Sequence, residues 1–247
     1  MWSNLGYTKS ENDLGTSRSD SKRWHGSVGA DLTLDDWLIV GLAAGFESDD
    51  TDTIFNGDNI EMKGFPIVTY VDALLTDQLS VDLAIGRTYL ETDQFRTSGT
   101  TRITSGLKGA RVFAAGNLNY GWSIQDWRIR TRAGLLWLRD DQGAFAESNS
   151  NAVARSVFRV GRAKFDGEVS RTYGVFEPFL RATYNTTFTL TQSASGGPSP
   201  DRDDMLINLG VRYFGENSLS GALEFNTLLG RDNIEEYSVN LLSRSEF

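Results

Sequence analysis

The sequence predicts an all-β protein: a transmembrane antiparallel β-barrel of twelve strands, of the outer-membrane type. Three observations carry this prediction. One segment alternates arginine with apolar residues, twelve segments show strand periodicity, and the connections between them alternate in length. The alternating segment is residues 127–138 (WRIRTRAGLLWL), in which Arg128, Arg130 and Arg132 occupy alternate positions, that is, one phase of the strand. Successive side chains of a strand point to opposite faces, so the arginines share one face and the apolar residues the other.

The apolar face of this segment favours a membrane over a soluble core. A soluble sheet with its arginines toward water would show the same alternation. Here, however, Trp127 and Trp137 lie about ten residues apart, which is the length of a membrane-spanning strand. Aromatic rings at both interfaces and a polar interior are typical of outer-membrane barrels.

The composition limits the other classes. The chain has 247 residues, no cysteine and a net charge of −9. We expect one domain over residues 1–247, with no disulfide, cofactor or metal site. Nucleic acid is not an expected partner, because phosphate binding needs a basic surface. The longest apolar run, residues 37–46, is shorter than the roughly 20 residues of a transmembrane helix.

The strands expected in the first half cover about residues 1–9, 23–34, 37–47, 61–75, 79–92 and 107–122. In residues 37–47, for example, one phase is wholly apolar: Leu38, Val40, Leu42, Ala44 and Phe46. The opposite, inward phase of the next three strands includes Asp72, Asp82 and Arg111. Arg87 falls on the apolar phase of its strand, which suggests a bulge or a misplaced register there.

The strands expected in the second half cover about residues 127–138, 153–165, 173–190, 205–214, 219–229 and 235–247. Residues 205–214 set Arg212 and Asn208 against an apolar phase of Ile207, Leu209, Val211 and Tyr213. The inward phase of the other strands in this half is predicted to hold Arg155, Arg159, Glu177, Arg181 and Glu224.

Long and short connections alternate between these strands, and the tight link before the last strand is the exception. The long ones are residues 10–22, 48–59, 93–105, 140–152 and 192–203, and the short ones are 35–36, 76–78, 123–126, 166–172 and 215–217. A soluble sandwich has no reason to place its long loops at one end. An outer-membrane barrel has short periplasmic turns and long extracellular loops. An even strand count then places both termini in the periplasm.

The last strand has the form of an assembly signal. In residues 236–247 (EYSVNLLSRSEF), Tyr237, Val239, Leu241 and Phe247 share one phase. An outward aromatic and apolar stripe that ends in phenylalanine looks like the signal read by the barrel-insertion machinery of the outer membrane, which we therefore expect as a partner.

Taken whole, the sequence resembles the C-terminal translocator domain of autotransporters (type V secretion). The segments that carry the resemblance are WSNLGYTKSEND, GSVGADLTLDDWLIVGLAAGFESDD, FEPFLRATYN and FGENSLSGALEFNTLLG. It implies a monomeric barrel in outer-membrane lipid, with a polar pore through which an upstream passenger reaches the cell surface. Family members usually hold a helix in the pore before the first strand. Because this sequence starts at that strand, the helix, the passenger and any self-cleavage junction are expected to lie outside it.

The candidate functional residues are charged side chains of the inward phase, predicted to line the lumen. They are Arg111, Arg128, Arg130, Arg132, Arg159, Arg181, Arg212, Asp72, Asp82, Glu177 and Glu224. Paired arginine and carboxylate rows can brace the wall of a wet lumen. An arginine track can instead set anion selectivity, or hold a helix or passenger in the pore.

Three functions follow from these patterns. The first is the translocator barrel of an autotransporter, which anchors its own passenger and helps to export it. The second is a standalone monomeric porin that favours anions or acidic oligosaccharides. The third is an outer-membrane hydrolase that uses His25, the only histidine, with Ser27 in the same phase. The triad there lacks an acid, so we predict no catalytic residue and no enzyme activity.

Overall fold

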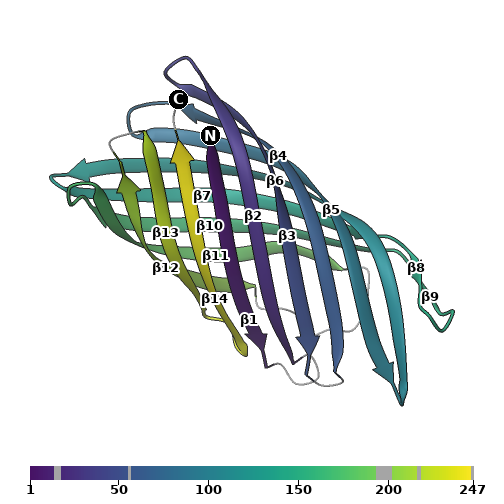
Figure 1. Cartoon of the computed structure of the whole chain (residues 1–247). Coiled ribbons are helices and arrows are strands. Elements are labelled where there is room, and N and C mark those ends of the chain that lie inside the picture. Colours follow the sequence, from purple (N-terminus) through teal and green to yellow (C-terminus); the bar gives the residue numbers. More distant parts are fainter. Residues whose placement is uncertain (14–17, 55–56, 193–201, 216–217, 246–247) are drawn as a thin grey trace.

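A computed structural model of the chain describes residues 1–13, 18–54, 57–192, 202–215 and 218–245. Twelve strands close into one antiparallel barrel in the order β1-β14-β13-β12-β11-β10-β7-β6-β5-β4-β3-β2, which confirms the predicted fold class and strand number (Figure 1). The barrel strands are β1 (Trp2–Asn12), β2 (Ser19–Leu34), β3 (Leu38–Thr53), β4 (Asp58–Leu74), β5 (Leu79–Ser98), β6 (Thr101–Ile124), β7 (Trp127–Gln142), β10 (Ser156–Arg171), β11 (Phe176–Gln192), β12 (Asp203–Phe214), β13 (Leu219–Leu229) and β14 (Ile234–Ser245). A separate two-stranded sheet joins β8 (Phe145–Ala146) to β9 (Ala152–Val153).

The barrel closes where its first and last strands pair. β1 and β14 are antiparallel over the whole of β1, from Trp2 opposite Arg244 to Asn12 opposite Ile234. The amino group of Met1 donates a hydrogen bond to the backbone carbonyl of Ser245 at 2.8 Å. The two ends of the chain therefore lie side by side at one end of the barrel (Figure 1).

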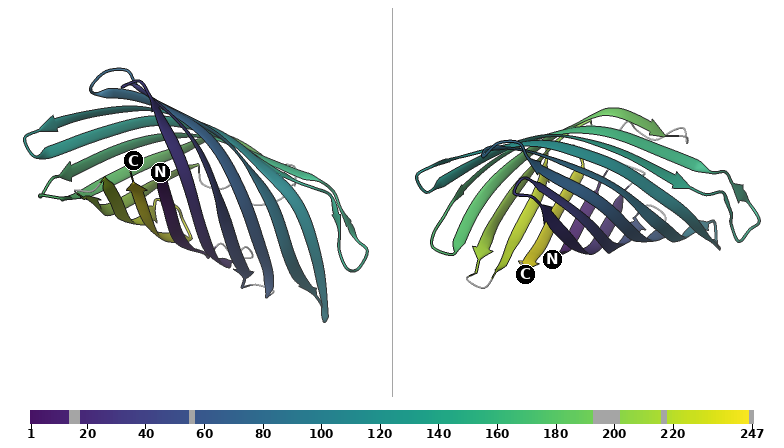
Figure 2. Two further views of the ribbon diagram at one scale, coloured as in Figure 1. Left: turned by 45° about the horizontal axis from the view of Figure 1, so that its top comes forward. Right: turned by 90° about the horizontal axis from the view of Figure 1, so that it is seen from above.

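The strands differ in length, and the hairpin of β5 and β6 projects furthest. These two strands have 20 and 24 residues, against 11 for β1 and 12 for β14. The barrel is therefore low along the β1–β14 seam and extended on the β5–β6 side, as Figures 1 and 2 show. No helix in the described part of the chain is long and apolar enough to cross a membrane.

Several predicted loops prove to be strands. Most of residues 48–59 belongs to β3 and β4, and most of residues 93–105 belongs to β5 and β6. The prediction failed there because apolar alternation marks only a strand with one apolar face. A hairpin that projects into water keeps its backbone ladder while both of its faces carry Asp, Ser and Thr. Residues 166–172, predicted as a turn, are likewise mostly strand, since β10 continues to Arg171.

Burial is inverted relative to a soluble protein. Large apolar side chains such as Leu118, Leu135 and Phe165 lie on the outer face and are about half exposed. The buried side chains are largely polar, and Glu177 is 0% exposed. A soluble sheet buries its apolar face, so the arrangement fits a lipid-facing outer surface around a polar interior.

The strand pairing shows which face of the barrel carries Arg87. Its strand pairs without a register shift with both neighbours, so the bulge suggested for this position is absent. The side chain shares the outer phase with Ile85 and Tyr89, and its guanidinium lies 5.0 Å from the centre of the Tyr89 ring. A register shift does occur between β10 and β11, at Gly161 and Arg162.

Candidate functional site: the charged interior

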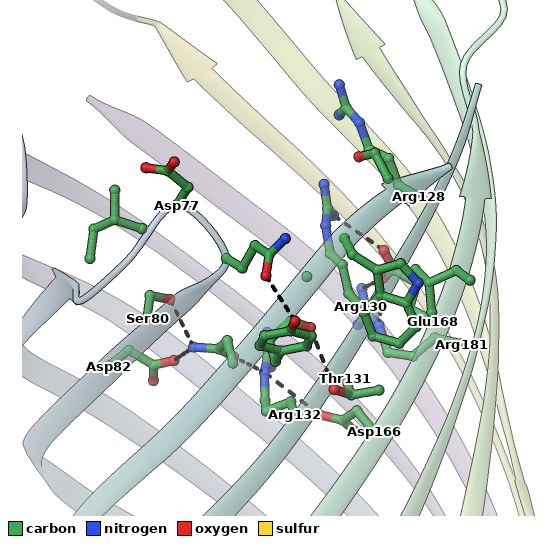
Figure 3. Close-up of a pocket in the computed structure, with 18 of the residues that line it drawn as sticks. Asp77, Ser80, Asp82, Arg128, Arg130, Thr131, Arg132, Asp166, Glu168 and Arg181 are labelled. Carbon is green, nitrogen blue, oxygen red and sulfur yellow. Dashed lines mark hydrogen bonds and ion pairs between the residues drawn. The ribbon is translucent and has the colours of Figure 1, made fainter. Parts of the chain in front are cut away.

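The arginines of β7 face a row of polar residues on β10. Arg128, Arg130 and Arg132 stand opposite Ser170, Glu168 and Asp166 in the β7–β10 register. The intervening residues, such as Ile129 and Ala133, point to the outer face. The alternation that predicted this strand thus places all three guanidinium groups on the inner face, where Figure 3 shows them in sequence along one ribbon.

Glu168 is the centre of the largest cluster of charges. Its side chain is 6% exposed, and it accepts hydrogen bonds from three arginines on three different strands. Arg130 of β7 donates at 3.2 Å, Arg181 of β11 at 2.8 and 3.0 Å, and Arg212 of β12 at 2.7 and 2.8 Å. Arg212 reaches Glu168 across β11, so the contact is possible only on the concave inner face. One carboxylate therefore ties four neighbouring strands together.

Glu177 is a second centre beside the first. Arg128 donates to it at 2.9 Å and Arg212 at 2.7 Å, while Arg130 lies 3.8 Å away. Arg212 is thus shared between the two carboxylates, and its guanidinium also lies 4.0 Å from the centre of the Phe179 ring.

Gly210 makes room for this stacked ring. A Cβ atom at that position would lie 2.4 Å from Phe179 Cζ. Sequence reasoning did not find this requirement, which depends on a neighbour across the sheet.

Amides and carboxylates continue the polar wall beyond Arg132. Asn119 accepts a hydrogen bond from Arg132 at 2.8 Å and donates to Asp82 at 2.9 Å. Asn117 donates to the same aspartate at 2.5 Å, and Asp72 stands opposite Asp82 in the β4–β5 register. Asp72, Asp82 and Asn119 line a cavity of about 440 Å³ together with the β7 arginines (Figure 3).

Arg111 lies in a separate cluster further along the barrel. It donates to Glu47 of β3 at 2.8 Å and to Asp140 of β7 at 3.2 Å. The bond to Glu47 passes over β4 and β5. It is possible because Gly64 stands opposite Glu47, where a Cβ atom would lie 2.4 Å from Glu47 Cγ.

The end of the barrel near the termini has its own cross-strand network. The indole of Trp2 donates to the Tyr70 hydroxyl at 2.6 Å, and that hydroxyl donates to Asp31 at 3.2 Å. Arg244 of the last strand donates to the same aspartate at 3.1 Å. The network links β14, β1, β2 and β4 across the closure of the barrel.

Some predicted site residues stand apart from these clusters. Glu224 joins only at the margin, 3.8 Å from Arg181 and hydrogen-bonded to Asn208 at 3.0 Å. Arg159 stands opposite Arg139 in the β7–β10 register, in the phase of Phe165 rather than that of Glu168. It is exposed, and the structure does not bring it to the other arginines of the interior.

The remaining predicted features are the apolar stripe of the last strand and His25. Tyr237, Val239 and Leu241 lie exposed on the outer face, whereas Phe247 lies outside the described residues. His25 is hydrogen-bonded to Asn240. The carboxylate opposite it in the register, Glu47, is held by Arg111.

The main omission of the sequence analysis was Glu168, with its neighbour Asp166. Both lie in residues 166–172, which the sequence analysis predicts as a short turn. The alternation of residues 164–170 (KFDGEVS) carried the signal, since Lys164, Asp166, Glu168 and Ser170 share one phase. Glu47, the last residue of a predicted strand, and Asp140, the first residue of a predicted long loop, were also not among the predicted site residues.

Outside the barrel wall, Arg96 of β5 fixes the loop that contains β8 and β9. Two of its nitrogens each donate to Glu147 at 2.7 Å. These bonds, with one from Asn151, lower the pKa of Glu147 to about 2. The loop is therefore held against the β5–β6 hairpin by a paired and hydrogen-bonded carboxylate.

Comparison with known proteins assigns the chain to a family. Residues 1–226 match the model of the autotransporter beta-domain. The chain belongs to the autotransporter β-domain family. It is thus a translocator barrel of the bacterial outer membrane that serves a passenger domain. A comparison with curated protein sequences finds no match.

Solved autotransporter structures share this fold. The translocator domain of NalP from Neisseria meningitidis superposes with a TM-score of 0.89 at 11% identity, over 100% of this chain and 87% of that one. The β domain of BrkA from Bordetella gives 0.81 at 14% identity, over 100% and 98%. The transport unit of AIDA-I from Escherichia coli gives 0.74 at 14% identity, over 100% and 90%. At these identities the likeness concerns the fold, and the residues of the interior are argued from this chain alone.

Proposed function

We propose that this autotransporter barrel anchors its own passenger in the outer membrane and helps to export it through the charged interior. The observation that carries the proposal is the cluster around Glu168 and Glu177. Its carboxylates are buried, whereas the side chains of Arg128, Arg130 and Arg132 remain 43 to 45% exposed toward the interior. The arginines therefore keep free donor capacity for backbone carbonyls or carboxylates of a chain in the pore.

The cluster also braces the wall. Four arginines (Arg128, Arg130, Arg181 and Arg212) surround the two glutamates and span β7, β10, β11 and β12. Cross-strand ion pairs of this kind resist flattening of a barrel whose interior is filled by water or by a transient chain. Bracing and passenger contact are compatible, because each guanidinium group has five N–H donors and the glutamates use only some of them.

Surface display tests export directly. A tagged passenger joined to the N-terminus should become accessible to antibody in intact cells. The variant Arg128→Gln/Arg130→Gln/Arg132→Gln should display less passenger, at an equal amount of folded barrel. Unchanged display would show that the arginines have no contact with the passenger.

We further propose that the short turns and both termini face the periplasm and that the long hairpins face the cell exterior. The strand lengths support this, since β5 and β6 project furthest at the end away from the termini (Figure 1). The chain has no cysteine, so single cysteines report topology cleanly. An impermeant maleimide should label Gly99→Cys in intact cells, and Asp77→Cys only after the outer membrane is permeabilised. The reverse pattern would overturn the orientation.

The partners follow from the same proposal. The barrel is a monomer in outer-membrane lipid, and Tyr237, Val239 and Leu241 form the stripe read by the insertion machinery. Replacing Tyr237 and Leu241 by serine should slow assembly in cells more than refolding of the purified chain into detergent.

A pore for anions is the second candidate, supported by the excess of four arginines over two glutamates in the central cluster. Conductance of the isolated barrel in a planar bilayer tests it. Anion selectivity that disappears in the arginine-to-glutamine triple variant would establish this role. An activity screen against phospholipid and lipid A, with His25→Ala as control, tests the hydrolase alternative.

A further inference from the structure

Three arginines lie on the outer face of the barrel, in one row across adjacent strands. Arg87 of β5 stands opposite Val112 of β6, Val112 opposite Arg139 of β7, and Arg139 opposite Arg159 of β10. Because directly opposed residues share a face, all three guanidinium groups are on the side that carries Leu118, Leu135 and Phe165. They belong to the lipid-facing surface.

The row marks the edge of the apolar band that is nearer the β5–β6 hairpin. On β7, Arg139 follows Trp137 by one step of the outer phase, and the apolar residues lie on the other side of that ring. Lys108 of β6 and Arg155, which precedes β10, lie two outer-phase positions further toward the β5–β6 hairpin. We name Arg87, Lys108, Arg139, Arg155 and Arg159 the outer basic patch. It lies toward the projecting β5–β6 hairpin.

Carboxylates neutralise only part of this patch. Asp141 binds Arg139 at 2.9 Å and Arg155, and Glu91 lies 3.2 Å from Lys108. Among the described residues, neither Arg87 nor Arg159 has a carboxylate partner. The patch thus holds five positive charges against two negative ones, although the whole chain has a net charge of −9.

The opposite side of the barrel has the reverse balance at the corresponding level. Lys9 and Lys22 stand opposite each other, one step beyond the rings of Tyr7 and Trp24. The acids of the outer phase around them on β14, β1, β2 and β3 are Glu235, Glu11, Asp20, Asp50 and Asp52. The excess of positive charge therefore lies on the side of β5, β6, β7 and β10, and it is not a general feature of this level of the barrel.

A groove accompanies the patch. It has a volume of about 600 Å³. Its lining includes the basic residues Arg87, Lys108, Arg139 and Arg155, the carboxylate Asp141, and the apolar side chains of Val112 and Trp137. Cationic groups above an apolar floor match a lipid with anionic groups on its head and acyl chains beneath. Guanidinium groups favour phosphate, which they bind bidentately.

From these observations we propose that the outer basic patch binds the phosphate groups of the phosphorylated glycolipid of the outer leaflet, of the lipid A type. The inference rests on the proposed orientation, which places the β5–β6 hairpin outside. The row of arginines then meets the level of the lipid headgroups, where basic side chains attract anionic lipid. Arg87 and Arg159, which have no carboxylate partner, supply the free charges, and Arg139 lies between them.

Lipid binding by the purified, folded chain in detergent tests the proposal. The probe is bisphosphorylated lipid A in mixed micelles, with dephosphorylated lipid A and phosphatidylglycerol as comparators, and affinity is measured by native mass spectrometry. Arg87→Gln/Arg159→Gln should weaken lipid A binding by about ten-fold or more, because two charge-assisted contacts are lost. The matched control Lys9→Gln/Lys22→Gln also removes two charges beyond an aromatic ring, and it should stay within about two-fold of wild type. Arg87→Lys/Arg159→Lys should restore most of the binding.

Three results would overturn the proposal: unchanged binding in Arg87→Gln/Arg159→Gln, an equal loss in the lysine control, or equal affinity for dephosphorylated lipid A or phosphatidylglycerol. Heat-dependent gel mobility verifies that each variant is folded. Passenger display by Arg87→Gln/Arg159→Gln should be unchanged, because neither residue reaches the interior. A failure of export or of topology would therefore appear in the display and labelling experiments, while the binding measured on the purified barrel would stand independently.

Discussion

Removing the charge of Glu168 should destabilise the barrel more than any equivalent change at its surface. The substitution Glu168→Gln keeps the shape of the side chain but removes its charge. It also replaces one of the two oxygens, which together accept five hydrogen bonds from three arginines, by an NH2 donor. Arg181 and Arg212 are well enclosed, with side chains 23% and 15% exposed, whereas Arg130 is 44% exposed and is screened by water. Counting mainly the two enclosed partners, we expect a loss of about 3–5 kcal/mol, as for a broken buried ion pair.

Urea unfolding of the refolded chain in detergent micelles measures this loss, with fluorescence of the six tryptophans as the signal. The matched control is Glu91→Gln, the same change in an exposed pair with Lys108, where both side chains are more than half exposed. It should cost less than about 1 kcal/mol. A loss below about 1 kcal/mol in Glu168→Gln would refute the bracing role. A double-mutant cycle with Arg212→Gln should show strong coupling between the two residues.

Three further predictions follow from the wall, the interior and the loop. Leu118→Arg places a charge on the outer face within the apolar band, and it should cost about 2–4 kcal/mol and lower the yield of folding into vesicles. Gly64→Val should displace the side chain of Glu47, break its bond to Arg111 and lower the urea midpoint. The pKa of Glu147 lies at about 2, below its unfolded value, so its pairing stabilises the loop above about pH 4.5. That contribution should disappear as the pH falls toward 2, seen as lower hydrogen-exchange protection factors in residues 143–151.

Two of these predictions, those for Leu118 and for the loop, have an internal control. Asn117→Arg, on the inner phase next to Leu118, should fold well because Asp82 can pair with the new charge. Equal tolerance of both arginine variants would contradict the inside and outside assignment. For the loop, the hydrogen-exchange protection of residues 143–151 in Glu147→Gln should stay the same from pH 5 to pH 2. A similar pH response in that variant would show that another group controls the loop.

Residue patterns alone were enough to identify the barrel. Alternation in residues 127–138 depends only on the period of a strand, and the turns at residues 35–36 and 76–78 are local. Both are properties of short segments, so they were readable before any tertiary contact was known. The same logic failed wherever a strand left the membrane. In residues 93–105 polar side chains occupy both faces, and the alternation on which the prediction depended disappears.

Partner choice within the interior was not predictable in this way. That Arg212 reaches Glu168 across β11, or that Arg111 reaches Glu47 across two strands, depends on closure and on the register around the barrel. The sequence pattern indicates the phase of a residue but not the partner that curvature brings to it. For Arg155 and Arg159 even the predicted inward phase was wrong, since both lie with Arg139 and Asp141 on the outer face.

The sequence by itself thus determined the fold class, the strand number and the polar character of one face, because period and composition are local quantities. Only the tertiary structure decided which charges meet. It gathered Arg128, Arg130 and Arg212 around two buried glutamates, and it placed Arg87 and Arg159 in one row on the outer face. The physical reason is closure: a sheet that closes on itself brings residues from distant strands together on its concave face, and its register alone decides which residues stand opposite one another.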